Sequence, residues 1–156
     1  MQEKTVKIDK KDIEILKELR ENCRNSVKNI AVKVKMHPNT ILQRIKRLER
    51  LGVIRGYKAD INFRKIGYDF HALVMLRSKK PEVVKDEETV KKLLRIAEIE
   101  SLYVLTGESD WAVVVRAIDR EHFMNVLNRI QEETQLRTIT SVILHTHKYP
   151  YEFNPL

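Results

Sequence analysis

The sequence predicts an α+β protein built from two parts, and three observations support that prediction. Apolar residues in residues 1–60 recur at helical spacing, in three short runs separated by turn residues. From residue 61 onward, the order of elements is strand, helix, strand, strand, helix, strand. The net charge of +8 lies wholly in residues 1–60, which hold 16 Lys and Arg against 8 Asp and Glu, whereas residues 61–156 hold 14 of each. A basic part joined to a neutral part indicates one module for a polyanion and one for another task.

Two short helices are predicted first. Asp9 can cap a helix over Lys10–Glu21, with Asp12 in its acidic first turn, and Ser26 can cap a second helix over Val27–Val34. The apolar residues predicted to face inward are Ile13, Leu16 and Leu19 in the first helix, and Val27, Ile30, Ala31 and Val34 in the second.

The third helix is the most distinctive stretch of the chain. Pro38 suits its first turn, Gly52 suits the position after its end, and residues 53–57 are predicted to form a short strand. Its apolar stripe consists of Ile41, Ile45, Leu48 and Leu51, and its opposite side is cationic. Three short helices with a cationic third helix, followed by a strand, describe a winged helix-turn-helix.

The second part has the β-α-β-β-α-β order of a ferredoxin-like domain. Strands are predicted over residues 68–78, 99–106, 111–118 and 137–148, and helices over residues 87–98 and 120–134. We therefore place the two domains at residues 1–60 and 61–156. Two helices cover only one face of a four-stranded sheet, yet the strands carry Val, Leu and Ile at successive positions. We expect a second copy of the chain to cover the other face.

With both parts assigned, nearly the whole chain resembles the Lrp/AsnC (feast/famine) transcription regulators. The motifs that carry the resemblance are Ile8-Asp9 with Ile15-Leu16, Asn22-Cys23-Arg24, Ile30-Ala31, the run from Arg44-Ile45-x-Arg47-Leu48-Glu49 through Gly52-Val53-Ile54 to Gly56-Tyr57, Ile66-Gly67, and Thr106-Gly107-Glu108-Ser109-Asp110. The chain departs from the family at Lys35, where Gly is usual, and at His37, where a Ser cap is usual. A left-handed Lys35 would cost ~1 kcal/mol.

The resemblance implies a sequence-specific regulator of transcription that binds double-stranded DNA and forms homodimers, tetramers or octamers. In a helix-turn-helix, the N-terminal part of the recognition helix, opened here by Pro38, contacts base edges, and flanking basic residues contact phosphates. The residues predicted to contact bases are Asn39, Thr40, Gln43 and Arg44, and those predicted to contact phosphates are Lys28, Lys33, Lys35, Lys46, Arg47, Arg50 and Arg55. Arg44 has an alternative role, which is to hold helices together.

The resemblance also implies a small effector, commonly an amino acid, bound between dimers. The Gly107 N–H is a donor for a carboxylate and Asp110 an acceptor for an ammonium group, and the predicted effector residues are Thr106, Gly107, Glu108, Asp110, Thr138 and Thr140. The alternative is an ordinary hairpin turn that uses Gly and Asp for backbone reasons.

An enzyme of the same architecture, similar to the sirohaem decarboxylases, is the runner-up, and a protein-interaction adaptor is a weaker third alternative. The enzyme's candidate residues would be His71, Arg77, Arg116 and His145. The charge speaks against both, because residues 24–58 hold ten basic residues and one acid.

We expect no resident cofactor and no metal site. His145 and His147 lack an evident third ligand and are predicted to be surface residues. Cys23, the single cysteine, is predicted to serve packing, and His71 to lie on a dimer face. With no disulfide pair, no apolar leader and no membrane span, a cytoplasmic protein is expected.

Overall fold

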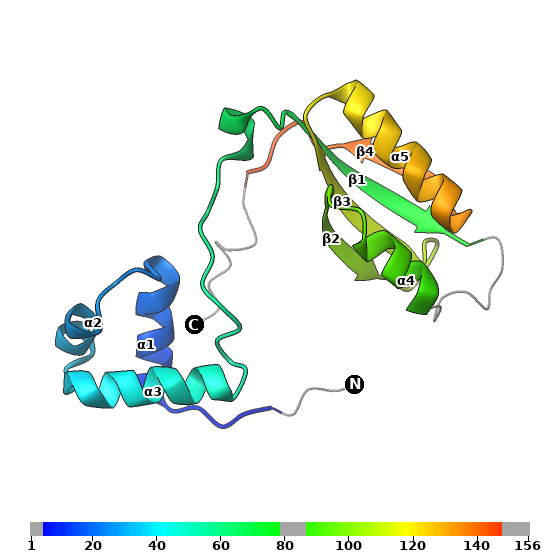
Figure 1. Cartoon of the computed structure of the whole chain (residues 1–156). Coiled ribbons are helices and arrows are strands. Elements are labelled where there is room, and N and C mark those ends of the chain that lie inside the picture. The colour runs from blue at the N-terminus through cyan, green and yellow to red at the C-terminus, as the bar shows by residue number, and fades with distance from the viewer. Residues whose placement is uncertain (1–4, 79–86, 148–156) are drawn as a thin grey trace. The chain divides into compact units, whose positions relative to one another are not determined.

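The computed structural model describes residues 5–78 and 87–147. They form two compact units, one within residues 1–60 and one within residues 61–150. Figure 1 shows a helical first unit and a second unit built around a sheet.

The first unit contains α1 (Lys10–Glu21), α2 (Val27–Val34) and α3 (Pro38–Arg50). The predicted bounds of α1 and α2 are confirmed, because the predicted caps form: Asp9 and Asp12 make a reciprocal capping box, and the Ser26 hydroxyl accepts from the Asn29 N–H. The predicted stripe of α1 is partly wrong. Ile15 is the fully buried apolar residue of that helix, whereas the predicted residues are only half-buried.

In the turn between α2 and α3, Lys35 adopts the left-handed conformation with φ 56°. His37 caps α3, since its Nδ1 accepts from the Asn39 N–H at 3.3 Å. The turn therefore keeps the geometry of a helix-turn-helix without the glycine and serine that are usual there.

The strand predicted over residues 53–57 is wrong. In the structure this segment has no ladder partner among the described residues. The backbone N–H groups of Val53 and Ile54 instead donate to the Leu48 carbonyl. These two residues follow Gly52, which is left-handed with φ 70°. These two donors close the end of α3 and so are not available to a sheet.

The second unit confirms the predicted order of elements. It contains β1 (Phe70–Arg77), α4 (Glu87–Leu94), β2 (Ile99–Val104), β3 (Trp111–Ala117), α5 (Arg120–Thr134) and β4 (Arg137–Val142), preceded by a 3-10 turn, η1 (Phe63–Ile66). The sheet is antiparallel with the order β2-β3-β1-β4, as in a ferredoxin-like fold.

Every predicted element of this unit except α5 is shorter than predicted, β1 and β3 by one to three residues. α4 ends at Leu94 because the next backbone N–H groups, of Arg95 and Ile96, donate to carbonyls three residues back, which tightens the chain into a turn. β2 ends at Val104 and β4 at Val142. The last residue of β4, Val142, pairs with Ala72, two residues after the start of β1. The residue predicted as the end of this strand, 148, lies outside the described residues.

The two faces of the sheet differ in cover. Figure 1 shows α4 and α5 beside the sheet. The core lies between the sheet and these two helices, and Val74, Trp111 and Val115 are fully buried in it. Residues of opposite parity, such as Leu73 and Val114, face away from the helices and are only half-buried. Among the described residues, no helix combines the length and the apolarity that a bilayer crossing requires.

Candidate nucleic-acid and effector sites

The N-terminal half of α3 presents a polar face. Ile41, Ile45 and Leu48 are buried, which turns Asn39, Gln43 and Lys46 to the exposed side and leaves Thr40 half-exposed. The other predicted DNA-contacting residues that are exposed are Lys28, Lys33, Lys35, Arg50 and Arg55, while Pro38 is half-exposed at the first turn.

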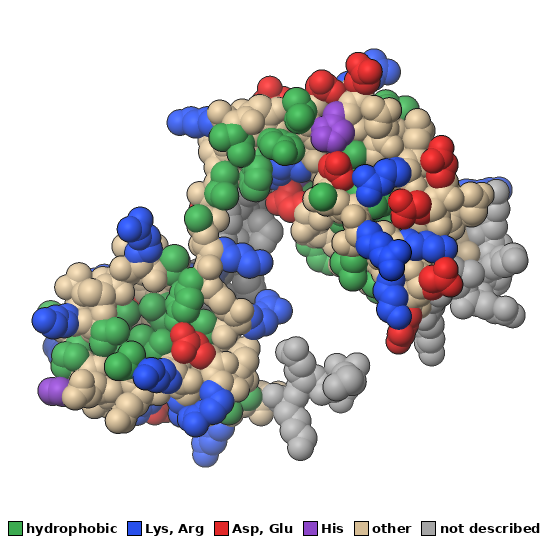
Figure 2. All heavy atoms as spheres, in the orientation of Figure 1, with side chains coloured by type: hydrophobic (Ala, Val, Ile, Leu, Met, Phe, Trp, Pro, Cys, Tyr) green, Lys and Arg blue, Asp and Glu red, His purple; other side chains and the backbone are tan. Residues whose placement is uncertain are grey.

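Positive charge surrounds this face. In Figure 2 the side chains of Lys and Arg dominate the charged atoms of the first unit, whereas both signs are mixed on the second unit. The one acid within residues 24–58, Glu49, accepts a hydrogen bond from the Tyr57 hydroxyl at 2.8 Å. Burial together with this bond raises the pKa of Tyr57 to about 12. The helix therefore offers donors and cations on one side and a packed core on the other.

Two arginines of α3 bind acids at the start of α1. Nη1 of Arg44 lies 2.7 Å from Oδ2 of Asp9 and 2.7 Å from Oδ1 of Asp12. Nη1 of Arg47 lies 3.1 Å from Oδ2 of Asp12, and its Nη2 donates to the Lys7 carbonyl at 3.1 Å. The Asp12 side chain is only 1% exposed. This cluster fixes the recognition-type helix on α1, as the alternative role for Arg44 anticipated.

Two members of the cluster, Asp9 and Arg44, have pKa values that shift in the direction that an ion pair requires. Hydrogen bonding to Arg44 lowers the pKa of Asp9, and hydrogen bonding to Asp9 and then Asp12 raises the pKa of Arg44. The sequence analysis identified Asp12 only as an acid in the first turn of α1, and its role in binding the two arginines was missed. Its position three residues after the cap can be recognised from sequence, but its burial under α3 depends on the tertiary fold.

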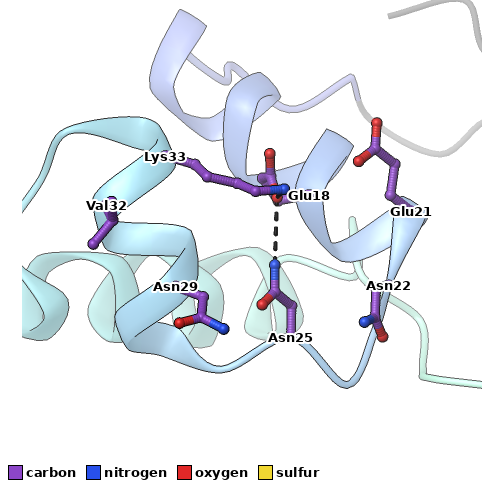
Figure 3. A pocket seen from close by; sticks show the side chains of 7 residues that line it. All are labelled: Glu18, Glu21, Asn22, Asn25, Asn29, Val32 and Lys33. Carbon is purple, nitrogen blue, oxygen red and sulfur yellow. Dashed lines mark hydrogen bonds and ion pairs between the residues drawn. The ribbon is translucent and has the colours of Figure 1, made fainter.

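Lys33 belongs to a different environment. Figure 3 shows it beside Glu18 and Asn25 in a hollow of about 460 Å³ between α1 and α2. Its Nζ lies 2.6 Å from Oε2 of Glu18, and that hydrogen bond raises the pKa of Lys33. The hollow is lined by Glu18, Glu21, Asn22, Asn25, Asn29, Val32 and Lys33. Two acids and three amides make this hollow a poor phosphate site.

The turn between β2 and β3 is held at its base. The Asp110 backbone N–H donates to the Leu76 carbonyl at 2.9 Å, and Oδ2 of Asp110 accepts from the Ser78 N–H at 2.7 Å. Gly107 has φ 117°, which a side chain would strain, and a Cβ built there meets no atom within 4 Å. Asp110 thus closes the end of β1, while the tip of the turn is open.

A hollow of about 690 Å³ adjoins this turn. It brings together two of the predicted effector residues, Glu108 and Thr138, whereas Thr106, Gly107, Asp110 and Thr140 are not part of its lining. It also contains two arginines that the effector prediction missed, Arg77 and Arg137. They are directly opposite each other in the pairing of β1 with β4, which a sequence reveals only when the strand register is known.

The candidate residues of the enzyme and metal alternatives lie in the second unit. His71 lies on the open sheet face, where Nη2 of Arg116 is 2.8 Å and Nε2 of His71 is 3.4 Å from Oε2 of Glu100. His145 and His147 stack edge to face with ring centroids 4.5 Å apart. In the described residues, no group of three or more His, Cys, Asp or Glu could hold a metal ion.

The packing role predicted for Cys23 in the first unit is wrong, because its side chain is exposed. Its Sγ lies 4.0 Å from the Lys58 carbonyl oxygen, at the turn between α1 and α2.

Comparison with known protein families matches both units. Residues 8–55 match the family described as winged helix-turn-helix DNA-binding, and residues 71–153 match the Lrp/AsnC ligand binding domain. Those matches cover the helical unit and most of the sheet unit, and so include both surfaces described above.

Individual relatives span nearly the full chain. The HTH-type transcriptional regulator LrpA of Mycobacterium tuberculosis is 28% identical over 139 residues, 89% of this chain and 91% of that protein. An HTH-type transcriptional regulator of Pyrococcus furiosus is 32% identical over 142 residues, 90% of each chain. Among solved structures, the feast or famine regulatory protein of M. tuberculosis complexed with L-methionine has a TM-score of 0.89 at 27% identity, covering 96% of this chain and 100% of that one.

Proposed function

The chain belongs to the Lrp/AsnC family of DNA-binding transcription regulators, and we propose that α3 contacts DNA while the sheet unit binds an amino-acid effector. Its relatives are named as regulators of transcription, so the enzyme alternative is set aside. The observation that carries the proposal is the exposed polar face of α3 in a basic unit, held on α1 by Asp12.

The residues on α3 divide into two roles. Asn39, Thr40 and Gln43 contact base edges, since amides and hydroxyls on an exposed first half of the helix match the donors and acceptors of the major groove. Phosphates are contacted by the exposed cations Lys28, Lys35, Lys46, Arg50 and Arg55.

Arg44 and Arg47 orient the helix through Asp12. Arg47 is 41% exposed and can bind a phosphate without leaving Asp12, whereas Arg44, at 26%, is the more enclosed of the two. Lys33 must leave Glu18 before it can bind a phosphate, so its contribution is smaller than that of an unpaired lysine.

The open face of the sheet binds a second copy of the chain. This face carries Leu73, Met75, Val114 and Ile139, of which Ile139 is 68% exposed. Burying such a face against its own copy removes apolar surface from water and gives the two-fold symmetry that a paired operator requires. A charge at Leu73 or Val114 tests the dimer, because these side chains lie on the open face. A charge at Val74 or Val115 would instead disturb the core under the helices.

The effector binds at the tip of the β2–β3 turn. The M. tuberculosis relative was solved with L-methionine, which supports an amino acid as the effector class. The Gly107 N–H is available to a carboxylate. Of the two acids in the turn, Glu108 is exposed, whereas Asp110 already accepts from the Ser78 N–H and supports the turn.

Selection of bound fragments from genomic DNA by the full chain at low salt tests the function. We expect pseudo-palindromic sites with half-sites about 34–36 Å apart or a multiple of that. Adding each of the twenty amino acids should change retention of the best site for at least one of them. Failure to retain DNA at low salt would contradict the proposed function.

The dimer is tested separately by light scattering. The wild type should scatter as a dimer or larger, Leu73→Asp should give a folded monomer, and Val74→Asp should unfold the sheet unit. A monomeric wild type at micromolar concentration would contradict the proposed interface.

A further inference from the structure

Arg77 and Arg137 form a pair of like charges on neighbouring strands. They are direct partners in the antiparallel register of β1 and β4, so their Cβ atoms are about 4.5–5.5 Å apart. Both are exposed, and within the described part of the chain neither forms an ion pair. Like charges directly opposite each other destabilise a sheet, so this pair does not hold the two strands together.

The hollow that contains the pair has the size and chemistry of a small-ligand site. Its volume of about 690 Å³ lies within the usual range for ligand sites. Among the described residues, its charged lining residues are Arg77, Arg137 and Glu108, which sum to a net charge of +1.

The rest of the lining is mixed: four residues are neutral and polar, and Met75, Leu136 and Ile139 are apolar. Gln131 is already oriented, since its Nε2 donates to the Thr138 hydroxyl at 2.7 Å. Met75 and Ile139 also belong to the sheet face proposed to bind a second copy, so the hollow lies at the edge of that face, where the pairing of β1 with β4 ends at Arg77 and Arg137.

Two guanidinium groups and one carboxylate complement a ligand with two carboxylates and one ammonium. A neutral amino acid offers only one carboxylate. One of the two guanidinium groups would therefore remain without a carboxylate and would still be repelled by the other. An acidic amino acid carries the charge of −1 that balances the hollow, and guanidinium groups bind carboxylates in bidentate geometry. We propose that this hollow binds an acidic L-amino acid, with its carboxylates on Arg77 and Arg137 and its ammonium on Glu108.

This inference rests on the proposed function, because it names the class of effector for the same turn. It also assigns distinct tasks to the two acids of the turn: Glu108 contacts the ligand, and Asp110 supports the turn through Ser78. A bound dicarboxylate would neutralise the repulsion between β1 and β4, so binding should stabilise the sheet unit.

Calorimetry on the full chain tests the assignment with five probes: L-glutamate, L-aspartate, L-glutamine, L-methionine and glutarate. Glutamate or aspartate should bind at least about tenfold more tightly than glutamine, which lacks the second carboxylate, and than glutarate, which lacks the ammonium. Arg77→Gln and Arg137→Gln should each weaken the acidic amino acid by about tenfold or more. Glu108→Gln should also weaken it but should strengthen glutarate, because removing this carboxylate removes a charge that repels the dianion. Arg95→Gln, at an exposed arginine outside the hollow, is the matched control and should have no effect.

Thermal unfolding of each variant separates loss of binding from loss of structure, because removing one of two opposed arginines should not lower the melting temperature. Tighter binding of methionine or glutamine than of both acidic amino acids would overturn the inference, as would indifference of the bound ligand to Arg77 and Arg137, or no binding by any probe. Retention of DNA by the same preparation shows whether the proposed function survives such a result.

Discussion

Arg44 in α3 and Arg77 in β1 carry the same side chain in opposite settings. Arg44 lies 2.7 Å from two carboxylates, one of them on the nearly fully buried Asp12. Arg77 lies opposite another arginine and has no acid partner in the described residues. The guanidinium group of Arg44 stabilises the fold, and that of Arg77 is available to bind a ligand. The difference teaches that the carboxylate within reach, and not the arginine itself, decides between structure and recognition.

Arg116 is an intermediate case. It donates to Oε2 of Glu100 from both Nε and Nη2, at 3.1 and 2.8 Å, and stands 4.9 Å from the ring centroid of Phe63. Its acid partner is 43% exposed, unlike Asp12. Such a pair contributes less to stability than a buried one, because water screens the charges.

The largest effect is expected from removing the buried acid. Asp12→Ala leaves Arg47 without its carboxylate, leaves Arg44 with Asp9 alone and breaks the capping box of α1, so the free energy of unfolding of the first unit should fall by ~3 kcal/mol. Urea denaturation followed by circular dichroism measures this. Glu14→Ala, which removes the exposed ion pair with Lys11, is the control and should cost less than ~1 kcal/mol. Equal losses for the two variants would contradict the structural role of the cluster.

A smaller effect is expected on DNA sequence preference. Gln43→Ala removes an exposed amide from the base-reading face, so discrimination between the preferred site and its single-base variants should fall by ~1–3 kcal/mol at one position. Lys46→Ala should instead weaken all sequences about equally, because it removes a cation that binds phosphate. Competition binding with a panel of duplexes distinguishes the two, and the same change in discrimination for both variants would show that α3 does not read bases as proposed.

Replacing Arg77 with an acidic residue should turn the ligand-binding pair Arg77 and Arg137 into an ion pair that stabilises the sheet. Arg77→Glu places opposite charges across β1 and β4, so the sheet unit should gain up to ~1 kcal/mol of stability while the acidic amino acid no longer binds. Differential scanning calorimetry and ligand titration on the same variant measure both quantities. Loss of stability would contradict the claim that the two arginines repel each other.

The smallest effect concerns pH. Burial, and then the neighbouring Arg116, lower the pKa of His71 from its usual 6.5, so this imidazole is neutral in the folded state at pH values where it is protonated in the unfolded chain. The stability that it contributes is complete above pH 6.5 and is lost as the pH falls below that value toward the lowered pKa. His71→Gln should flatten the slope of unfolding free energy against pH in that window, and an unchanged slope would show that other groups cause it.

The fold was largely predictable because its signals are local. Caps at Asp9 and Ser26 mark helix starts that the structure confirms, and the β-rich runs predict the order of elements along the chain. The segment at residues 53–57 was mispredicted because its extended pattern carries no information on whether a partner strand exists. Propensity alone cannot show that Val53 and Ile54 are used to end a helix.

The sites were less predictable because they depend on distances across the fold. Spacing along α3 places Gln43 and Lys46 on its exposed side, so these residues could be named from sequence. The burial of Asp12 under Arg44 requires the packing of α1 on α3, and the opposition of Arg77 and Arg137 requires a register. Neither has a signature within a short window of sequence.

The dependence of DNA affinity on salt tests most directly the claim that the exposed cations Lys28, Lys35, Lys46, Arg50 and Arg55 bind phosphates. Fluorescence anisotropy of a labelled operator, over roughly 50 to 200 mM salt, should give a log affinity that falls linearly with log salt. Replacing Lys28, Lys46 and Arg50 together with Gln should flatten that slope by about 0.9 for each phosphate that the protein no longer neutralises, while Arg77→Gln leaves it unchanged. An unchanged slope in the triple variant, or an affinity that does not respond to salt, would contradict that claim.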